Sequence, residues 1–224
     1  MNKELNPRQI KTIQNFWTWF QDNEQAIYNA CKLEINKDEV LFHLQRNLNY
    51  VSKRIEYFIT SHPQDENKLK VFITAHGYRK LFPKMKELQE KTPILNFFSI
   101  QVYITPLNLE IPSLPTDLLE AIQNTQIKFE DYNTATKKII LTLYSKEIHW
   151  ELNKKRMERY AYLLLLFTLG EIKYKKHIED FNCELIPQNT NGLLSLSELP
   201  EFIDYLAKIN YSRKLKIFFE WLKP

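Results

Sequence analysis

The chain has 224 residues, 44% of them hydrophobic and 13% aromatic, so it can bury a sizeable core. A charged fraction of 26% excludes wholesale disorder, and a net charge of +4 only weakly indicates nucleic-acid binding. Three glycines exclude a glycine-rich phosphate-binding loop, and two distant cysteines favour buried free thiols over a disulfide framework. Because Met1–Gln9 has no apolar signal core and the apolar run Tyr160–Leu169 is about half a bilayer span, we expect a cytoplasmic protein without a membrane segment.

The first 31 residues predict one long helix. Asn6 is suited to cap it, and Pro7 suits the first helical position, where a missing N–H costs nothing. Glu24 interrupts an apolar seam with spacings of three and four, and the seam's aromatic residues indicate core packing, with an exposed protein anchor as the alternative. The seam and its flanking aromatic residues are Ile10, Ile13, Phe16, Trp17, Trp19, Phe20, Ile27 and Cys31.

A second helix and a β-hairpin are expected next. Asn36 with Glu39 resembles a capping box, which predicts a helix over residues 38–51. Two alternating segments joined by the polar loop 61–67 then predict two antiparallel strands. The inward residues of the helix and of the strands are Leu41, Leu44, Leu48 and Val51, then Ile55, Tyr57, Ile59, Leu69, Val71 and Ile73.

The middle of the chain returns to helix and then to strand. His76 and Gly77 end the hairpin and lead into a short helix over residues 79–90. Residues 97–105 have the cleanest alternation in the chain and predict a third strand, and a proline-rich connection leaves room for a short strand over 108–111.

The second half predicts further strands around the longest helix. The expected elements are a helix from Thr116 to Gln123, strands over 127–131 and 137–145, a helix over 152–169 ended by Gly170, a strand over 181–186 and a helix capped by Ser197. Hairpins predominate over regular strand–helix–strand alternation, and no repeat or linker is evident. We therefore predict a single α+β domain, residues 1–224, with a mainly antiparallel sheet packed with helices.

A family resemblance rests on three passages taken in order. They are Phe16 to Phe20 followed by Asn23-Glu24, Ile73 to Gly77 followed by Lys80 to Pro83, and Leu196 to Ile203. Together they resemble an uncharacterised bacterial family known only as a domain of unknown function. The chain departs from that family at His76, where members have glutamate, and after Pro93, where they usually have tryptophan. The resemblance implies an α/β fold and no activity, so it supplies no catalytic residue.

Four polar residues are candidate ligand contacts. Glu24 on an apolar seam must find a partner or take up a proton, and we favour a structural role over a site carboxylate. His76, Tyr78 and Arg79 cluster at a strand-to-helix turn, where a small anion could bind, although residues that merely cap a helix give the same pattern. A pocket near Glu24, His76 and Arg79 would make the chain a small-molecule-binding protein or an enzyme.

Other chemistry finds little support in the sequence. None of the five histidines has the paired spacing of a metal site, and no GxSxG elbow is present. We therefore predict no catalytic residue, no metal and no cofactor. The basic residues of 154–159 and 173–176 are interspersed with Glu158 and Glu171, which favours a solvated helix face and disfavours nucleic acid as a partner.

The last segment, residues 211–224, is the candidate docking element. Its apolar residues recur at amphipathic helical spacing, and such a terminal helix serves either its own domain or a partner. The candidate interface residues are Phe218, Phe219, Trp221 and Leu222. Because site chemistry is missing while apolar surface is plentiful, we expect a non-catalytic protein-binding module whose partner is another protein or a second copy.

Overall fold

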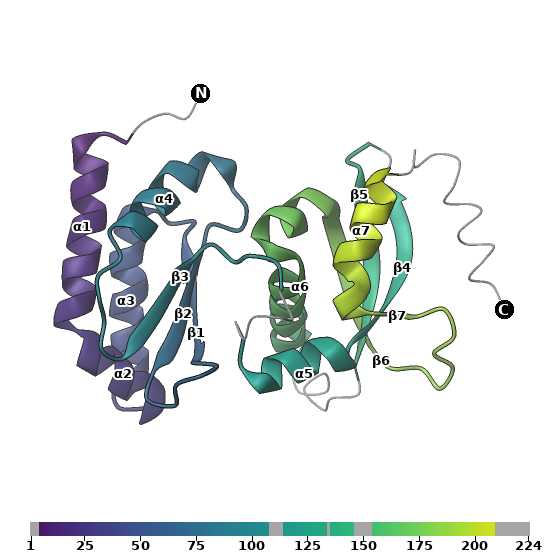
Figure 1. The fold of residues 1–224 in the computed structure, drawn as a ribbon, viewed down its shortest axis with the longest axis horizontal. Coiled ribbons are helices and arrows are strands. Elements are labelled where there is room, and N and C mark those ends of the chain that lie inside the picture. The colour runs from purple at the N-terminus through teal and green to yellow at the C-terminus, as the bar shows by residue number, and fades with distance from the viewer. Residues whose placement is uncertain (1–4, 108–113, 134, 146–153, 209–224) are drawn as a thin grey trace. The chain divides into compact units, whose positions relative to one another are not determined.

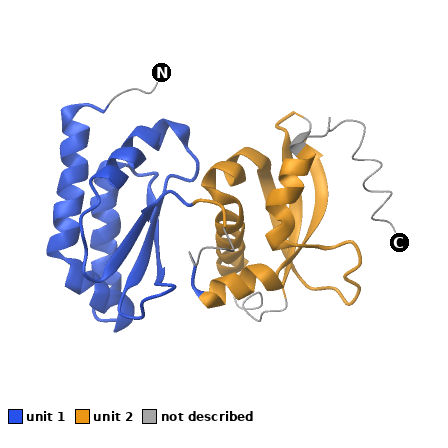
Figure 2. Ribbon diagram, in the orientation of Figure 1, with its two compact units in different colours: residues 1–104, 108–115 blue, residues 105–107, 116–224 orange. Residues whose placement is uncertain are grey.

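The computed structural model describes residues 5–107, 114–133, 135–145 and 154–208, with the side chains of 207 and 208 excepted. Its contacts divide the chain into two compact units, coloured separately in Figure 2. Unit 1 comprises residues 1–104 with 108–115, and unit 2 comprises residues 105–107 with 116–224. Each unit has its own sheet and its own helices, and each is described by itself.

Unit 1 begins with three helices, α1 (Pro7–Asp22), α2 (Glu24–Lys32) and α3 (Lys37–Val51). Asn6 and Gln9 form a capping box at the start of α1, which confirms the predicted cap. The single long helix is wrong, because the chain breaks at Asn23, whose backbone leaves helical geometry and whose side-chain amide donates to the carbonyl of Trp19 at 2.8 Å. The predicted capping box of α3 is also wrong, since Asn36 has a left-handed backbone (φ 48°) and its side chain makes no cap bond.

The sheet of unit 1 has the strand order β1-β2-β3. β1 (Glu56–Ser61) and β2 (Leu69–Thr74) form the predicted antiparallel hairpin, and β3 (Phe98–Val102) pairs with β2 in parallel. The crossover between β2 and β3 is the 3₁₀ turn η1 (Arg79–Leu81) followed by α4 (Phe82–Glu90), as predicted for 79–90. Figure 1 shows α1, α3 and α4 on one side of this sheet.

The aromatic residues of α1 form the centre of the unit 1 core. Phe16, Trp17 and Phe20 are almost fully buried, and the ring of Phe20 meets Phe98 of β3 edge-on at 5.3 Å between centroids. The indole N–H of Trp17 donates to the carbonyl of Leu88 at 3.0 Å, so the buried polar atom of this ring has a partner. Core packing is therefore confirmed for Phe16, Trp17 and Phe20, whereas Trp19 is only partly buried.

Unit 2 has a four-stranded sheet of order β6-β5-β4-β7. β4 pairs antiparallel with β5 and with β7, whereas β6 runs parallel to β5. The predicted cap Ser197 lies inside the 3₁₀ turn that precedes the closing helix, and this turn is capped by Ser195, which forms a capping box with Glu198. The elements are α5 (Thr116–Asn124), β4 (Gln126–Asn133), β5 (Lys138–Ser145), α6 (Lys154–His177), β6 (Ile178–Leu185), β7 (Leu194–Ser195), η3 (Leu196–Glu198) and α7 (Leu199–Lys208).

The longest helix, α6, is interrupted at Gly170. Its backbone there is left-handed (φ 70°), and an added Cβ would lie 2.7 Å from the ring of Pro106. The amide of Leu107 donates to the carbonyl of Thr168 at 3.4 Å, next to the interruption. The predicted helix end at Gly170 coincides with this interruption, and a further helical stretch follows it and continues to His177. None of the helices within the described ranges combines the length and apolarity that crossing a membrane requires.

The α+β class and the mainly antiparallel pairing are confirmed, because three of the five strand pairs are antiparallel. The strands form two sheets, one in each unit. The single folding domain stays a prediction, since a division of contacts does not measure whether the units unfold together. The short strand expected over 108–111 lies outside the described residues.

Candidate functional site

The side chain of Glu24 is buried and hydrogen-bonded within unit 1. It is the first residue of α2, it is 8% exposed, and its carboxylate accepts the backbone N–H of Phe97 at 2.6 Å. A carboxylate at a helix N-terminus is favoured by the helix dipole, and a short charge-assisted bond compensates part of the desolvation. This geometry agrees with the favoured structural role of Glu24.

His76 lies in a tight turn that follows β2. The central residues of the turn, His76 and Gly77, both have left-handed backbones (φ 50° and 68°), and the amide of Tyr78 donates to the carbonyl of Ala75 at 2.9 Å. The amide of His76 donates to the hydroxyl of Thr74 at 2.9 Å, which helps to hold the non-glycine residue in this strained conformation.

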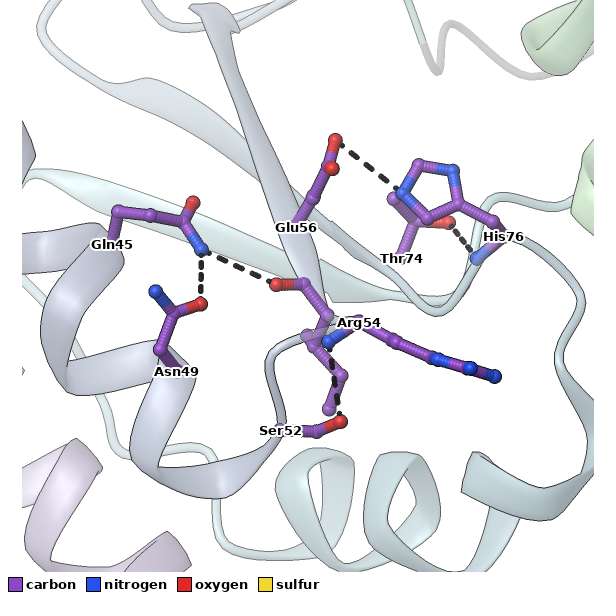
Figure 3. Close-up of polar contacts among 8 residues, drawn as sticks. Gln45, Asn49, Ser52, Arg54, Glu56, Thr74 and His76 are labelled. Atoms are coloured by element: carbon purple, nitrogen blue, oxygen red, sulfur yellow. Dashed lines mark hydrogen bonds and ion pairs between the residues drawn. The ribbon is translucent and has the colours of Figure 1, made fainter.

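The side chain of His76 meets the hairpin. Its Nε2 lies 3.4 Å from a carboxylate oxygen of Glu56 in β1, and Figure 3 shows the two groups facing each other. The guanidinium of Arg54 lies 5.0 Å from the centre of the Tyr78 ring, a cation–π contact. Arg79 begins η1 and is exposed. The structure therefore gathers His76 and Tyr78 with Arg54 and Glu56, two residues that sequence reasoning missed.

Glu24 does not belong to this group. Its partner Phe97 precedes Phe98, which pairs with Leu69 at the start of β2, whereas His76 follows the end of β2. Six residues of strand span about 20 Å. The expected pocket near Glu24, His76 and Arg79 is corrected accordingly, because Glu24 lies at the opposite end of the sheet.

The groups around His76 include an imidazole, a carboxylate and a guanidinium, which offer binding contacts. Within the described residues, no three metal-ligating side chains cluster. Cys31 and Cys183 are free thiols. Burial raises the pKa of Cys31, and burial together with the charge of Glu158 raises the pKa of Cys183 to about 12, so both are poor nucleophiles.

A groove of about 400 Å³ opens between the first two helices and α3 in unit 1. Three apolar side chains and four polar ones line it, so it is suited to an amphipathic occupant rather than to a purely apolar one. The lining residues are Trp19, Asn23, Ala26, Asn36, Glu39, Val40 and His43.

Exposed apolar side chains border this groove. Leu33 and Ile35, in the turn that leads to the lining residue Asn36, are 62% and 51% exposed. The ring of Phe42, 62% exposed, contacts the lining residue His43 at 5.5 Å between centroids. Tyr50, 63% exposed, lies seven residues after His43 and therefore on the same side of α3. We call the groove and these four residues the α2–α3 face.

Sequence reasoning missed the α2–α3 face, although a signal for it was present. The inner side of α3 was assigned to Leu41, Leu44, Leu48 and Val51, and the last three are buried. Phe42 and Tyr50 do not fit that seam, and large apolar residues outside the core seam of an amphipathic helix indicate a second contact surface.

The basic region of α6 has the character of a solvated face. Lys154, Arg156 and Lys176 are exposed, and Lys154 lies 4.0 Å from Glu158. Lys173 donates to both carboxylate oxygens of Asp204 in α7, at 2.8 and 2.9 Å. These neighbouring carboxylates reduce the positive potential that phosphates would need. The candidate interface residues Phe218, Phe219, Trp221 and Leu222 lie outside the described residues.

Comparison of the chain with protein-family models, with curated proteins and with solved structures finds no match. The resemblance to a family of unknown function therefore stays a prediction. Function must be inferred from the surfaces of the molecule.

Proposed function

We propose that this chain is a non-catalytic protein-binding module and that the α2–α3 face is its binding surface. The observation that carries the proposal is the coincidence of a groove with four exposed large apolar side chains on adjoining elements. Scattered exposed apolar residues are normal, but a grouped set beside a concavity is typical of interaction sites. The partner is another protein or a second copy of the chain.

The chemistry of the face suits an amphipathic helical segment. Trp19 and Val40 provide apolar walls, while Asn23 and His43 provide polar contacts beside them. A helix lying in such a groove inserts large apolar side chains at spacings of three and four residues. Each such side chain that becomes buried contributes about 1.5–3 kcal/mol, so several of them, together with polar contacts, are needed to offset the about 4–15 kcal/mol that association costs.

The test combines partner capture with groove variants of the full chain. Ala26→Trp would fill the groove from an exposed position on α2, and Phe42→Glu would place a charge on its border. Ile94→Glu is the matched control, because Ile94 is 97% exposed in the same unit and does not line the groove. We expect partners crosslinked to the wild-type chain to be lost with the first two variants and kept with Ile94→Glu. Equal capture by all four proteins would refute the proposal.

A second candidate function rests on the turn around His76. The guanidinium of Arg54, which lies over the ring of Tyr78 at this turn, favours a small-anion site that does not involve Glu24. In a thermal-shift screen of anionic metabolites, a stabilising ligand should lose its effect with Arg54→Ala and retain it with Glu24→Gln. A screen without any stabilising anion would dismiss this candidate.

We further propose a cytoplasmic location. The support is that Cys31 and Cys183 are both free thiols, as expected in a reducing compartment.

A further inference from the structure

The charges around the groove favour a positively charged occupant. Glu39 lines the groove, and Asp22 and Asp38 directly precede the lining residues Asn23 and Glu39. Within the described contacts none of these three acids has an ion-pair partner, although Asp38 and Glu39 also suit the N-terminal turn of α3. The neighbouring cations are already engaged: Lys37 pairs with Glu34, Lys32 donates to the carbonyl of Glu66 at 3.2 Å, and Arg46 donates to the hydroxyl of Tyr50 at 3.2 Å. An occupant that carries cations beside large apolar side chains would therefore complement both the apolar border and the acidic end of the groove.

The C-terminal segment of this chain, residues 209–224, has that composition. Four cations accompany one acid, Glu220, and four apolar residues recur at spacings of three, four and seven. The cations are Arg213, Lys214, Lys216 and Lys223, and the spaced apolar residues are Leu215, Phe218, Phe219 and Leu222. Three of the cations precede Phe218 and Phe219, so positive charge is concentrated in the first half of the segment.

We propose that the α2–α3 face binds the C-terminal segment of a second copy of this chain. This inference rests on the proposed function and names its partner. In a helical segment, the apolar residues Leu215 to Leu222 would extend about 10 Å, and the stretch of α3 from Glu39 to Tyr50 extends about 16 Å. The segment therefore fits along α3, with Lys214 near Glu39 and the aromatic residues near Phe42 and Tyr50.

Binding between two copies does not depend on how the two units of one chain are arranged. Each copy offers one groove and one segment, so reciprocal binding closes a two-fold dimer through two identical contacts. The effect of doubling is large, because the second contact forms within an existing complex and benefits from a high effective concentration.

Two full-length variants test the proposal by complementation. Ala26→Trp blocks the groove and leaves the segment intact, whereas the double variant Phe218→Glu, Phe219→Glu disables the segment and leaves the groove intact. In sedimentation-velocity experiments we expect the wild type to dimerise, each variant alone to weaken association at least tenfold, and the equimolar mixture of the variants to form a heterodimer through its one intact contact. Ile94→Glu should dimerise like the wild type.

A labelled synthetic peptide of residues 209–224 provides an independent readout. Its fluorescence anisotropy should rise on titration with the full-length Phe218→Glu, Phe219→Glu protein, whose groove is free of competition from its own segment. The peptide should bind Ala26→Trp at least tenfold more weakly, and raised salt should weaken binding to the intact groove, because exposed charges are screened. Circular dichroism verifies that each variant keeps the wild-type fold.

The outcomes separate this inference from the proposed function. A wild-type chain that stays monomeric, or a mixture of variants that fails to associate, overturns the dimer. If the peptide also fails to bind while crosslinked partners still depend on Ala26, then the groove serves another protein and only the further inference falls. If Ala26→Trp changes neither peptide binding nor partner capture, both fall.

Discussion

The two units of the molecule share one order of elements and differ in what is added to it. In unit 1, helix α3 precedes the hairpin β1–β2, a helical crossover follows, and β3 pairs in parallel with β2. In unit 2, helix α5 precedes the hairpin β4–β5, helix α6 follows, and β6 pairs in parallel with β5. The same helix–hairpin–helix–strand topology thus occurs twice in succession.

The crossover helices show how differently the two units use this topology. In unit 1 the crossover helix α4 has 9 residues and only Met85 and Leu88 are buried in it. In unit 2 the crossover helix α6 has 24 residues, and its continuous buried run from Leu164 to Glu171 lies in the interior of the unit. A short amphipathic helix suffices where α1 supplies the aromatic core, whereas α6 must supply much of the core of unit 2 itself.

The candidate binding surface is formed with elements that only one of the two units has. Unit 1 adds α1 and α2 before the shared elements, and the groove lies where these helices meet α3. Unit 2 adds β7 and α7 after them, and these extend the sheet and pack against α6. The shared topology therefore serves as scaffold, and the candidate binding surface belongs to the part that only one unit has.

The largest losses of stability are expected from substitutions that remove a buried side chain from the core of one unit at a time. Trp17→Ala in unit 1 and Leu165→Ala in unit 2 each remove a buried side chain and should destabilise by about 3–5 and 2–5 kcal/mol respectively. If the chain is one folding domain, as its sequence predicts, both variants shift a single denaturant transition seen by fluorescence and by circular dichroism. Two separate transitions, with each variant shifting only one of them, would contradict the single domain.

The next largest effect is expected where the helix of unit 2 is interrupted. Gly170→Ala places a Cβ 2.7 Å from Pro106 on a left-handed backbone, so strain and overpacking together should cost about 2–4 kcal/mol. Gly192→Ala is the matched control, because Gly192 has a similar φ of 80° but is exposed, and should cost about 1–2 kcal/mol. Chemical denaturation measures both, and equal losses would show that the contact with Pro106 is unimportant.

Much of the fold could be predicted because periodic spacing reports burial directly. The hairpin around Val71 and the helix that contains Leu165 follow from alternation and from an apolar run, and both predictions were correct. The break at Asn23 was missed, because the apolar seam continues across it and only the interruption at Glu24 indicated a change. The parallel pairing of β3 depends on the route of the crossover, which local spacing does not encode.

The candidate site was less predictable than the fold. His76 and Tyr78 were singled out from the turn, but Glu56 begins β1 and Arg54 lies just before it. Only the register of the hairpin brings these partners together. The α2–α3 face depends on which side of a helix the core leaves uncovered. The packing of the core decides which side of a helix stays exposed, so the role of a residue such as Tyr50 can be assigned only once the core residues are known.

Alkaline pH should weaken unit 2 through two partly buried acids, Cys183 and Tyr174. Desolvation, with the charge of Glu158, raises the pKa of Cys183 from 9.0 to about 12, and desolvation, with Asp180, raises the pKa of Tyr174 from 10.0 to about 12. Each group stays neutral in the fold while it ionises in the unfolded chain, so its stabilising contribution is complete below pH 9 and is lost between pH 9 and 12. Through Cys183 we expect the free energy of unfolding to fall by about 1–2 kcal/mol over this pH range, less than the full pKa shift would give, because the thiol is partly exposed to solvent.

Cys183→Ser would sharpen this result, because the serine hydroxyl does not ionise in the same range. The variant should show a smaller decline in denaturation midpoint between pH 9 and pH 11 than the wild type. Cys31→Ser is the comparison in unit 1, where burial also raises the pKa of the thiol while Lys37 opposes the shift. A decline that is identical in all three proteins would assign the alkaline loss to other groups.

The smallest expected effect concerns the ion pair that joins α6 to the added helix α7. Lys173 donates to both oxygens of Asp204, but the two side chains are 32% and 55% exposed, so solvent screens their attraction. Asp204→Asn should therefore cost less than about 1 kcal/mol, and the cost should shrink as salt is raised. Lys128 and Glu130, a partly exposed pair within β4, provide a control that does not involve α7. Lys128→Gln, which leaves the bond from the Thr142 hydroxyl to Glu130 in place, should cost a similar amount. A loss above about 2 kcal/mol for Asp204→Asn alone would mean that docking of α7 depends on this pair, and that the added helix is held by charge rather than by its buried Leu199, Ile203 and Leu206.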